Sequence, residues 1–178
     1  VAAAMLSRLP DAEAALERPR LFGSAASIGI VDVVLGREAS RPVEVRERWL
    51  EYRLEGEFSL GAPGDRRVAL KGVADRVDLL AGNRLRVIDY KSGRPPNPKH
   101  ALQAATYAMC ARERLGERGG GPWTVDEASY VAFTGKRTLV PVVRPGASDA
   151  DTVLAGVRNR LFDAVHGIEQ GVFPPRPH

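Results

Sequence analysis

The feature that most constrains the fold is a pair of strand-like runs, residues 67–80 and 84–91, separated only by Ala81-Gly82-Asn83. A connection of this length and composition is typical of a β-hairpin, so the two runs are expected to pair as antiparallel neighbours. A loop dense in Gly and Pro follows at residues 92–98, and residues 99–115 then show helical spacing of apolar side chains. The order of strand, strand, loop and helix indicates an α/β fold.

Further strands are expected on both sides of this hairpin. Residues 43–58 alternate well enough for one long strand or two, with apolar side chains on one side. Residues 128–134 and 138–143 read as a second hairpin, joined at Gly135-Lys136. The predicted core therefore extends over residues 43–143.

Helices are expected to flank this core. Residues 2–18 have helix-forming composition up to Pro19, with a break near Pro10 that predicts two short helices. Residues 20–35 are apolar and are interpreted as a buried helix. A long amphipathic helix is expected near the end of the sequence. The chain is thus read as one domain, 1–178, with its core at 43–143 and flanking helices at 2–35 and 150–170.

The composition is that of a globular protein with a basic net charge. The chain has 178 residues, of which 44% are hydrophobic and 27% charged, an ordinary globular balance. No apolar run approaches the roughly 20 residues that a membrane-spanning helix needs, and no secretory signal is apparent, so a cytoplasmic location without a membrane partner is expected. The single cysteine, Cys110, is expected to be a small core residue. The formal charge of +4 suits a surface that binds a polyanion.

Two acidic residues lie where the paired strands can bring them together, Asp75 on the first strand and Asp89 on the second. Two carboxylates in one pocket repel each other unless a hard cation neutralises them. Magnesium, or manganese in its place, prefers oxygen ligands and keeps several waters. The two carboxylates and the main-chain carbonyl of Tyr90 would therefore leave room for a phosphate oxygen, an arrangement that suits phosphodiester hydrolysis with one metal ion or two.

Three further side chains complete this candidate site. Lys91 lies two residues after Asp89 and, because strand side chains repeat with period two, points to the same face. Its ammonium could position or help to deprotonate the attacking water, or stabilise charge on the phosphate in the transition state. Gln103 and Tyr107 are spaced i, i+4 and so share one face of the following helix, from which both can reach the site or the DNA backbone.

These residues, in this order, resemble a known signature. G-x-x-D ends at Asp75, an apolar pair precedes D-Y-K-S-G at residues 89–93, and Q-x-x-x-Y spans residues 103–107. The pattern is similar to the PD-(D/E)XK nuclease superfamily, within it to the RecB-like branch, and most of all to the C-terminal nuclease domain of AddB-type subunits. This resemblance implies a restriction-endonuclease-like fold, a mixed β-sheet flanked by α-helices.

The resemblance also implies roles for the matching residues. Asp75, Asp89 and the carbonyl of Tyr90 match the metal ligands, Lys91 matches the catalytic lysine, and the catalytic motif on the helix falls on Gln103 and Tyr107.

The activity that the resemblance implies is that of a metal-dependent deoxyribonuclease, expected to act as an exonuclease in double-strand break repair and end resection. Its substrate would be single-stranded or double-stranded DNA ends, and its partner the helicase subunit of an AddAB/RecBCD-like complex. The implied location is the bacterial cytoplasm, at the nucleoid.

The sequence departs from this family pattern in two places. RecB-like nucleases usually carry a metal-binding histidine ahead of the core, whereas His100, His166 and His178 all follow the acids. Many AddB-like nucleases also hold a [4Fe–4S] cluster, with cysteines after a segment like residues 171–178. Such a cluster is possible in a full-length protein but is not ligated within this chain. The sequence is therefore expected to be a piece of a longer chain.

Alternative roles remain for the chain and for several side chains. A catalytically inactive DNA-binding or scaffolding module of the same complex is the rival to an enzyme. Asp78 is expected to pair with Arg76 or to form a turn rather than to bind metal. Arg76, Arg94 and Lys99 are candidates for DNA phosphate contacts. Glu47 is the best candidate for a further metal-binding acid, although its Glu/Arg run is more typical of a solvated strand face.

Overall fold

The computed structural model describes residues 6–62, 64, 66–119, 121–133 and 139–172. The chain divides into two compact units, Val1–Val43 and Glu44–His178, which are described separately. Among the described residues, none of the helices combines the length and the apolar character needed to cross a bilayer.

In the first unit, helix α2 (Asp11–Phe22) is followed by helix α3 (Ile30–Ser40). The prediction that a helix ends before Pro19 was wrong, because α2 contains this proline, whose carbonyl still accepts the N–H of Gly23 at 2.8 Å. A buried helix over residues 20–35 was also wrong. Gly23 takes a positive φ of 79° and the chain turns before α3, which contains no buried residue.

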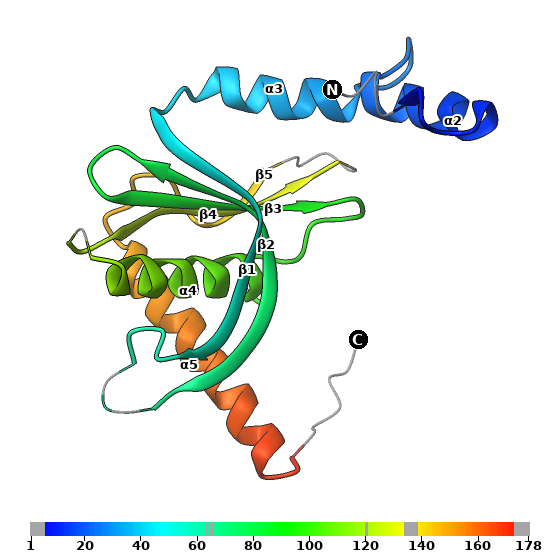
Figure 1. Cartoon of the computed structure of the whole chain (residues 1–178). Coiled ribbons are helices and arrows are strands. Elements are labelled where there is room, and N and C mark those ends of the chain that lie inside the picture. The colour runs from blue at the N-terminus through cyan, green and yellow to red at the C-terminus, as the bar shows by residue number, and fades with distance from the viewer. Residues whose placement is uncertain (1–5, 63, 65, 120, 134–138, 173–178) are drawn as a thin grey trace. The chain divides into compact units, whose positions relative to one another are not determined.

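The second unit contains a mixed five-stranded sheet in the order β1-β2-β3-β4-β5 (Figure 1). The two long strands β1 (Val45–Phe58) and β2 (Val68–Leu80) are antiparallel, and β2 pairs antiparallel with β3 (Arg84–Lys91). The connection between β2 and β3 has positive φ at both Gly82 and Asn83, as its composition predicted. Strand β4 (Thr124–Ala132) is parallel to β3 and antiparallel to β5 (Leu139–Val143). The turn predicted at Gly135-Lys136 lies outside the described residues.

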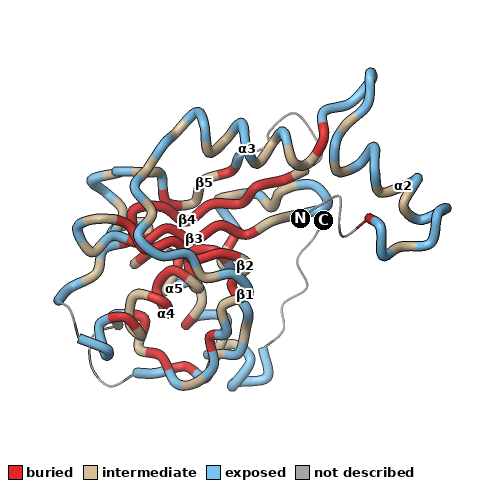
Figure 2. The backbone as a smooth tube through the Cα atoms, turned by 45° about the horizontal axis from the view of Figure 1, so that its top comes forward, coloured by how far each residue is buried: buried red, intermediate tan, exposed pale blue. Residues whose placement is uncertain are grey.

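Two helices cover one face of this sheet. Helix α4 (Gln103–Glu117) connects the parallel strands β3 and β4, and helix α5 (Ala150–Glu169) follows β5. Buried side chains of both helices form one hydrophobic core with the sheet, and buried residues follow β2, β3 and β4 (Figure 2). Cys110 is part of this core, as expected, and burial raises the pKa of its thiol to about 12. The predicted α/β fold, a mixed sheet flanked by helices, is confirmed.

The side-chain alternation of β1 changes phase in the middle of the strand. Leu54 and Phe58 are buried in the core, and Trp49 and Tyr52, three residues apart, pack against the same core with their rings stacked 4.7 Å apart. An odd spacing on one face requires an irregularity between them, and Glu51 supplies it with a φ of 50°. The irregularity lies between the pairs Leu50–Arg76 and Tyr52–Ala74, so it falls beside Asp75 on β2.

Candidate active site

The candidate site lies where β2 and β3 part. Their ladder ends with the pair Arg76–Ile88, whereas the ladder between β3 and β4 continues to Lys91–Ala132. Asp75 is the next residue on β2 beyond the last pair, and Asp89 is the next on β3. The two carboxylates predicted to meet therefore stand at the opening of a strand pair.

The carboxylate of Asp75 accepts a main-chain hydrogen bond from β3 beyond the point where the β2–β3 ladder ends. Its Oδ2 accepts the main-chain N–H of Tyr90 at 2.7 Å. The carbonyl of Lys91 accepts the N–H of Phe133 at 3.0 Å, on the side of β4. Because successive residues of a strand direct their N–H and C=O groups to opposite sides, the N–H and the carbonyl of Tyr90 are both directed toward β2. The predicted main-chain ligand is thus directed toward the same side as Asp75.

Asp89 is buried, with 1% of its surface exposed. Its Oδ1 lies 2.6 Å from Nζ of Lys91, close enough for an ion pair, yet this buried oxygen has no hydrogen bond of good geometry. Burial raises the pKa of the Asp89 carboxyl, the Lys91 ammonium opposes this shift, and the negative charge of Asp75 adds to it. The two acids thus lie close enough for the negative charge of Asp75 to disfavour ionisation of Asp89.

A chain of side chains links Lys91 to helix α4 and to β2. Nζ of Lys91 donates to Oε1 of Gln103 at 2.9 Å, and Nε2 of Gln103 donates to the hydroxyl of Tyr107 at 3.3 Å. The Tyr107 ring lies so close to Gly72 that an added Cβ would come within 2.6 Å of the hydroxyl. The glycine of the G-x-x-D motif therefore makes room for the tyrosine of the Q-x-x-x-Y motif.

One residue at the site was not anticipated from the sequence. Tyr130 on β4 is paired with Asp89 in the parallel ladder and is buried, with 1% exposed. Its hydroxyl accepts the N–H of Ala104 in the first turn of α4 at 3.1 Å, and its ring lies 5.6 Å from Nζ of Lys91. The start of α4, whose cap residue makes no side-chain cap hydrogen bond, is thus held from β4. Alternation along residues 128–134 could have placed Tyr130 on the core side, but not beside Lys91.

The predicted phosphate-binding residues do not all belong to this surface. Arg76 is only 3% exposed and donates to the carboxylate of Asp78, so its assignment as a surface DNA contact is corrected, whereas its predicted pairing with Asp78 is confirmed. Arg94 and Lys99 are exposed on the segment between β3 and α4. Glu47 is also exposed and accepts a hydrogen bond from Nε1 of Trp49.

The donor set fits a hard divalent cation. The site offers two neighbouring carboxylates, one of them with a buried oxygen that has only an ion-pair contact with Lys91, and the main-chain carbonyl of Tyr90, all of them oxygen ligands. No group of three or more acidic, histidine or cysteine side chains suited to a metal occurs within the described part of the chain. With the two carboxylates and the carbonyl of Tyr90 as its protein ligands, a cation would complete its shell with water or substrate, as magnesium sites commonly do.

The mixed sheet brings two acids and a lysine together where two strands part, an arrangement that suits metal-assisted hydrolysis. The profile of the PD-(D/E)XK nuclease superfamily matches residues 2–178, and the chain belongs to this superfamily. Membership suggests a nuclease that binds DNA, and members typically use divalent metal ions.

Comparison with other known proteins adds little beyond this. The crystal structure of SSO0001 has 18% sequence identity and a TM-score of 0.30. The match covers 75% of this chain and 59% of that chain, so the chain spans less than two thirds of the length of the solved structure. No curated protein matches the sequence.

Proposed function

We propose that this chain is a magnesium-dependent DNA nuclease that hydrolyses phosphodiester bonds at the site formed by Asp75, Asp89 and Lys91. The observation that carries the proposal is the opening between β2 and β3. There the buried carboxylate of Asp89 lies beside the ammonium of Lys91 and near the second carboxylate, that of Asp75. The superfamily match covers residues 2–178 and supports the interpretation of the whole chain as one nuclease domain.

Each proposed role follows from the contacts of the residue. Asp75 and Asp89 would hold a cation with their carboxylates, and Asp75 also accepts a hydrogen bond from the main-chain N–H of Tyr90. Lys91 is oriented by Gln103, which in turn is held by Tyr107, so the ammonium stays beside the acids with little rotational freedom. From there it stabilises the charge that develops on the phosphate, or orients the attacking water.

The cation would supply the remaining chemistry when bound, namely polarisation of the phosphoryl group and a lowered pKa of a coordinated water. Magnesium is proposed, with manganese as a substitute, because all the available ligands are oxygen atoms.

The direct test is cleavage of end-labelled single-stranded and double-stranded DNA with magnesium, manganese or EDTA, comparing the wild-type chain with Asp89→Asn and Lys91→Ala. Each substitution should lower the cleavage rate by about a thousandfold or more, because the interactions lost are those that stabilise the transition state. Two surface controls match these variants: Asp151→Asn, which alters an ion pair with Arg112, and Lys71→Ala, which alters one with Glu55.

The results separate an enzyme from its rival, a catalytically inactive DNA-binding module. Metal-dependent cleavage that is lost in both site variants and retained in both controls supports the nuclease. DNA binding without cleavage in any metal, unchanged by the site substitutions, would instead favour the scaffold. Activity that survives both site substitutions would overturn the assignment of the site.

We further propose that the nuclease acts as an exonuclease in end resection, together with the helicase subunit of an AddAB/RecBCD-like complex. The support is the signature from Gly72 to Tyr107, which resembles the RecB-like branch. Cleavage of linear but not of covalently closed circular DNA would support exonuclease action. Co-purification of the chain with a helicase that loads on blunt DNA ends would support the partner, and cutting of closed circles at equal rate would contradict end-dependent action.

A further inference from the structure

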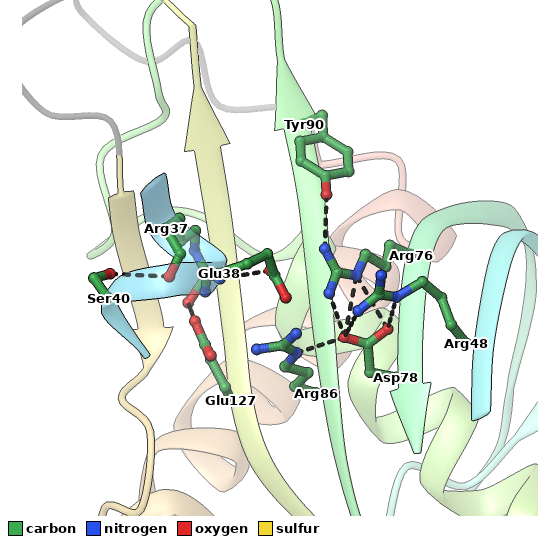
Figure 3. A network of polar contacts seen from close by, with 10 residues as sticks. Arg37, Glu38, Ser40, Arg48, Arg76, Asp78, Arg86, Tyr90 and Glu127 are labelled. Atoms are coloured by element: carbon green, nitrogen blue, oxygen red, sulfur yellow. Dashed lines mark hydrogen bonds and ion pairs between the residues drawn. The ribbon is translucent and has the colours of Figure 1, made fainter. Parts of the chain in front are cut away.

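A second polar cluster is built on β1, β2 and β3, around the carboxylate of Asp78 (Figure 3). This side chain is completely buried and is bound by three guanidinium groups. Arg76 donates to it at 2.6 Å, Arg86 at 2.6 Å and Arg48 at 2.7 Å. Val77 and Leu79 point into the core with α4, so Asp78 and Arg76 point to the opposite face of the sheet.

The three guanidinium groups keep the carboxylate of Asp78 ionised. Burial alone would raise the pKa of Asp78, but hydrogen bonds from Arg76, Arg48 and Arg86 outweigh it and lower the pKa to about 2. The carboxylate is therefore ionised at neutral pH and fixes the guanidinium of Arg76 by three hydrogen bonds, two from Nε and one from Nη2.

The same guanidinium also contacts Tyr90, the residue between Asp89 and Lys91, on the face of the sheet opposite to α4. Nη1 of Arg76 donates to the hydroxyl of Tyr90 at 3.2 Å, and Figure 3 shows the two side chains directed toward each other. The Tyr90 ring also stacks on Phe133, with centroids 5.8 Å apart. Tyr90 lies between Asp89 and Lys91, and its main chain is at the point where the β2–β3 ladder has ended.

Tyr90 is consequently held at two points, its main-chain N–H and its side-chain hydroxyl. Asp75 accepts its main-chain N–H at the opening, and Arg76, the next residue along β2, holds its hydroxyl on the opposite face. Without the ladder to β2, Tyr90 is held by these two contacts, by the pairing with β4 and by the stacking of its ring on Phe133.

We propose that Arg76, locked by Asp78, is a positioning residue that fixes Tyr90 from behind the sheet and so keeps the main-chain carbonyl of Tyr90 aimed at the cation held by Asp75 and Asp89. The inference rests on the proposed metal-dependent function and deepens it. Outer contacts of this kind orient the ligands of a metal, and their removal typically lowers metal affinity by about 10–100-fold.

The first variant is Tyr90→Phe, which removes the hydroxyl that accepts from Arg76 but keeps the ring and the main chain. Its matched control is Tyr52→Phe, since Tyr52 stacks on Trp49 in β1. The dissociation constant of Mn²⁺ is measured with the whole chain by electron paramagnetic resonance of the free ion, without DNA. Tyr90→Phe should weaken Mn²⁺ binding about tenfold at an unchanged melting temperature, and Tyr52→Phe should leave both unchanged.

A second variant tests the route through Arg76. Arg76→Lys keeps a positive charge beside Asp78. The lysine ammonium cannot contact Asp78 and Tyr90 at the same time, because it lacks the separate N–H donors of the planar guanidinium. It should weaken Mn²⁺ binding to the same extent, and the double variant Arg76→Lys/Tyr90→Phe should lose no more than either single variant. Additive losses would overturn the route through Arg76.

The outcomes distinguish this inference from the function on which it rests. Wild-type-like Mn²⁺ affinity in Tyr90→Phe, with a wild-type chain that binds the ion and cleaves DNA, overturns the positioning role and leaves the nuclease proposal intact. A wild-type chain that neither binds Mn²⁺ nor cleaves DNA overturns both.

Discussion

Two aspartates on the same pair of strands have opposite surroundings. Asp89 shares its pocket with a second acid, Asp75, and its nearest cation is the single ammonium of Lys91, whereas Asp78 is surrounded by three guanidinium groups. Both carboxylates are buried, yet the pKa of Asp89 is raised and that of Asp78 is lowered to about 2. An excess of acid leaves a site that favours an added cation, and an excess of base completes a structural ion cluster.

The comparison is tested most strongly by giving both positions the same substitution. Asp78→Asn removes the carboxylate charge that binds the buried side chains of Arg76 and Arg86, and it should lower the free energy of unfolding by about 3 kcal/mol or more. Asp89→Asn removes a desolvated charge from an acid-rich pocket and should leave that free energy unchanged or slightly higher. Urea denaturation of the metal-free chain measures both. Equal destabilisation by the two substitutions would show that the pockets do not differ as the charges indicate.

Acid titration tests the same contrast through protonation. The folded-state pKa of Asp78 lies below its unfolded value, so its contribution is complete above about pH 4 and is lost as the pH falls toward 2. The expected loss is about 2 kcal/mol. Asp89 has the opposite sign, because a raised pKa means that the folded state takes up its proton more readily, so protonation of Asp89 favours folding.

The measurement is the free energy of unfolding between pH 2 and pH 6, a range that covers about two units on either side of the ordinary aspartate pKa. The wild-type chain should lose stability more steeply than Asp78→Asn over the lower half of this range. An identical pH dependence in the two proteins would contradict the lowered pKa of Asp78.

The sequence was sufficient for features that depend on local spacing. Period-two alternation and the Gly82-Asn83 turn predicted the hairpin, and the order of the motif residues predicted that Asp75, Asp89 and Lys91 would lie together. These features are local because strand periodicity and turn chemistry are set within a few residues.

Features that depend on distant pairing could not be predicted. Arg48 is 30 residues from Asp78, and its contribution to the buried cluster requires the register of β1 on β2. The position of Tyr130 beside Asp89 requires the parallel pairing of β3 with β4 through α4. The apolar composition of residues 20–35 does not reveal the end of α2, which depends on Gly23, whose positive φ turns the chain.

The smallest expected effect concerns the space beneath Tyr107. Gly72→Ala places a Cβ within 2.6 Å of the Tyr107 hydroxyl, so the ring must shift and the hydrogen bond from Gln103 is lost. Because the clash is with the end of a side chain, the cost in stability should be only about 1 kcal/mol. The loss in cleavage rate should be larger in relative terms, about tenfold, since Gln103 orients Lys91.

The matched control is Gly116→Ala in α4, where an added Cβ meets no atom within 4 Å. It should leave the cleavage rate unchanged and stabilise the helix by a few tenths of a kcal/mol or more. Replacing Tyr107 by Leu relieves the clash. In the Tyr107→Leu variant, Gly72→Ala should therefore change the stability and the cleavage rate little further. If Gly72→Ala instead cleaves DNA as fast as Gly116→Ala, then Lys91 keeps its orientation without the hydrogen bond between Gln103 and Tyr107. The hydrogen bonds that run from Tyr107 through Gln103 to Lys91 would then not be what places the ammonium beside Asp89.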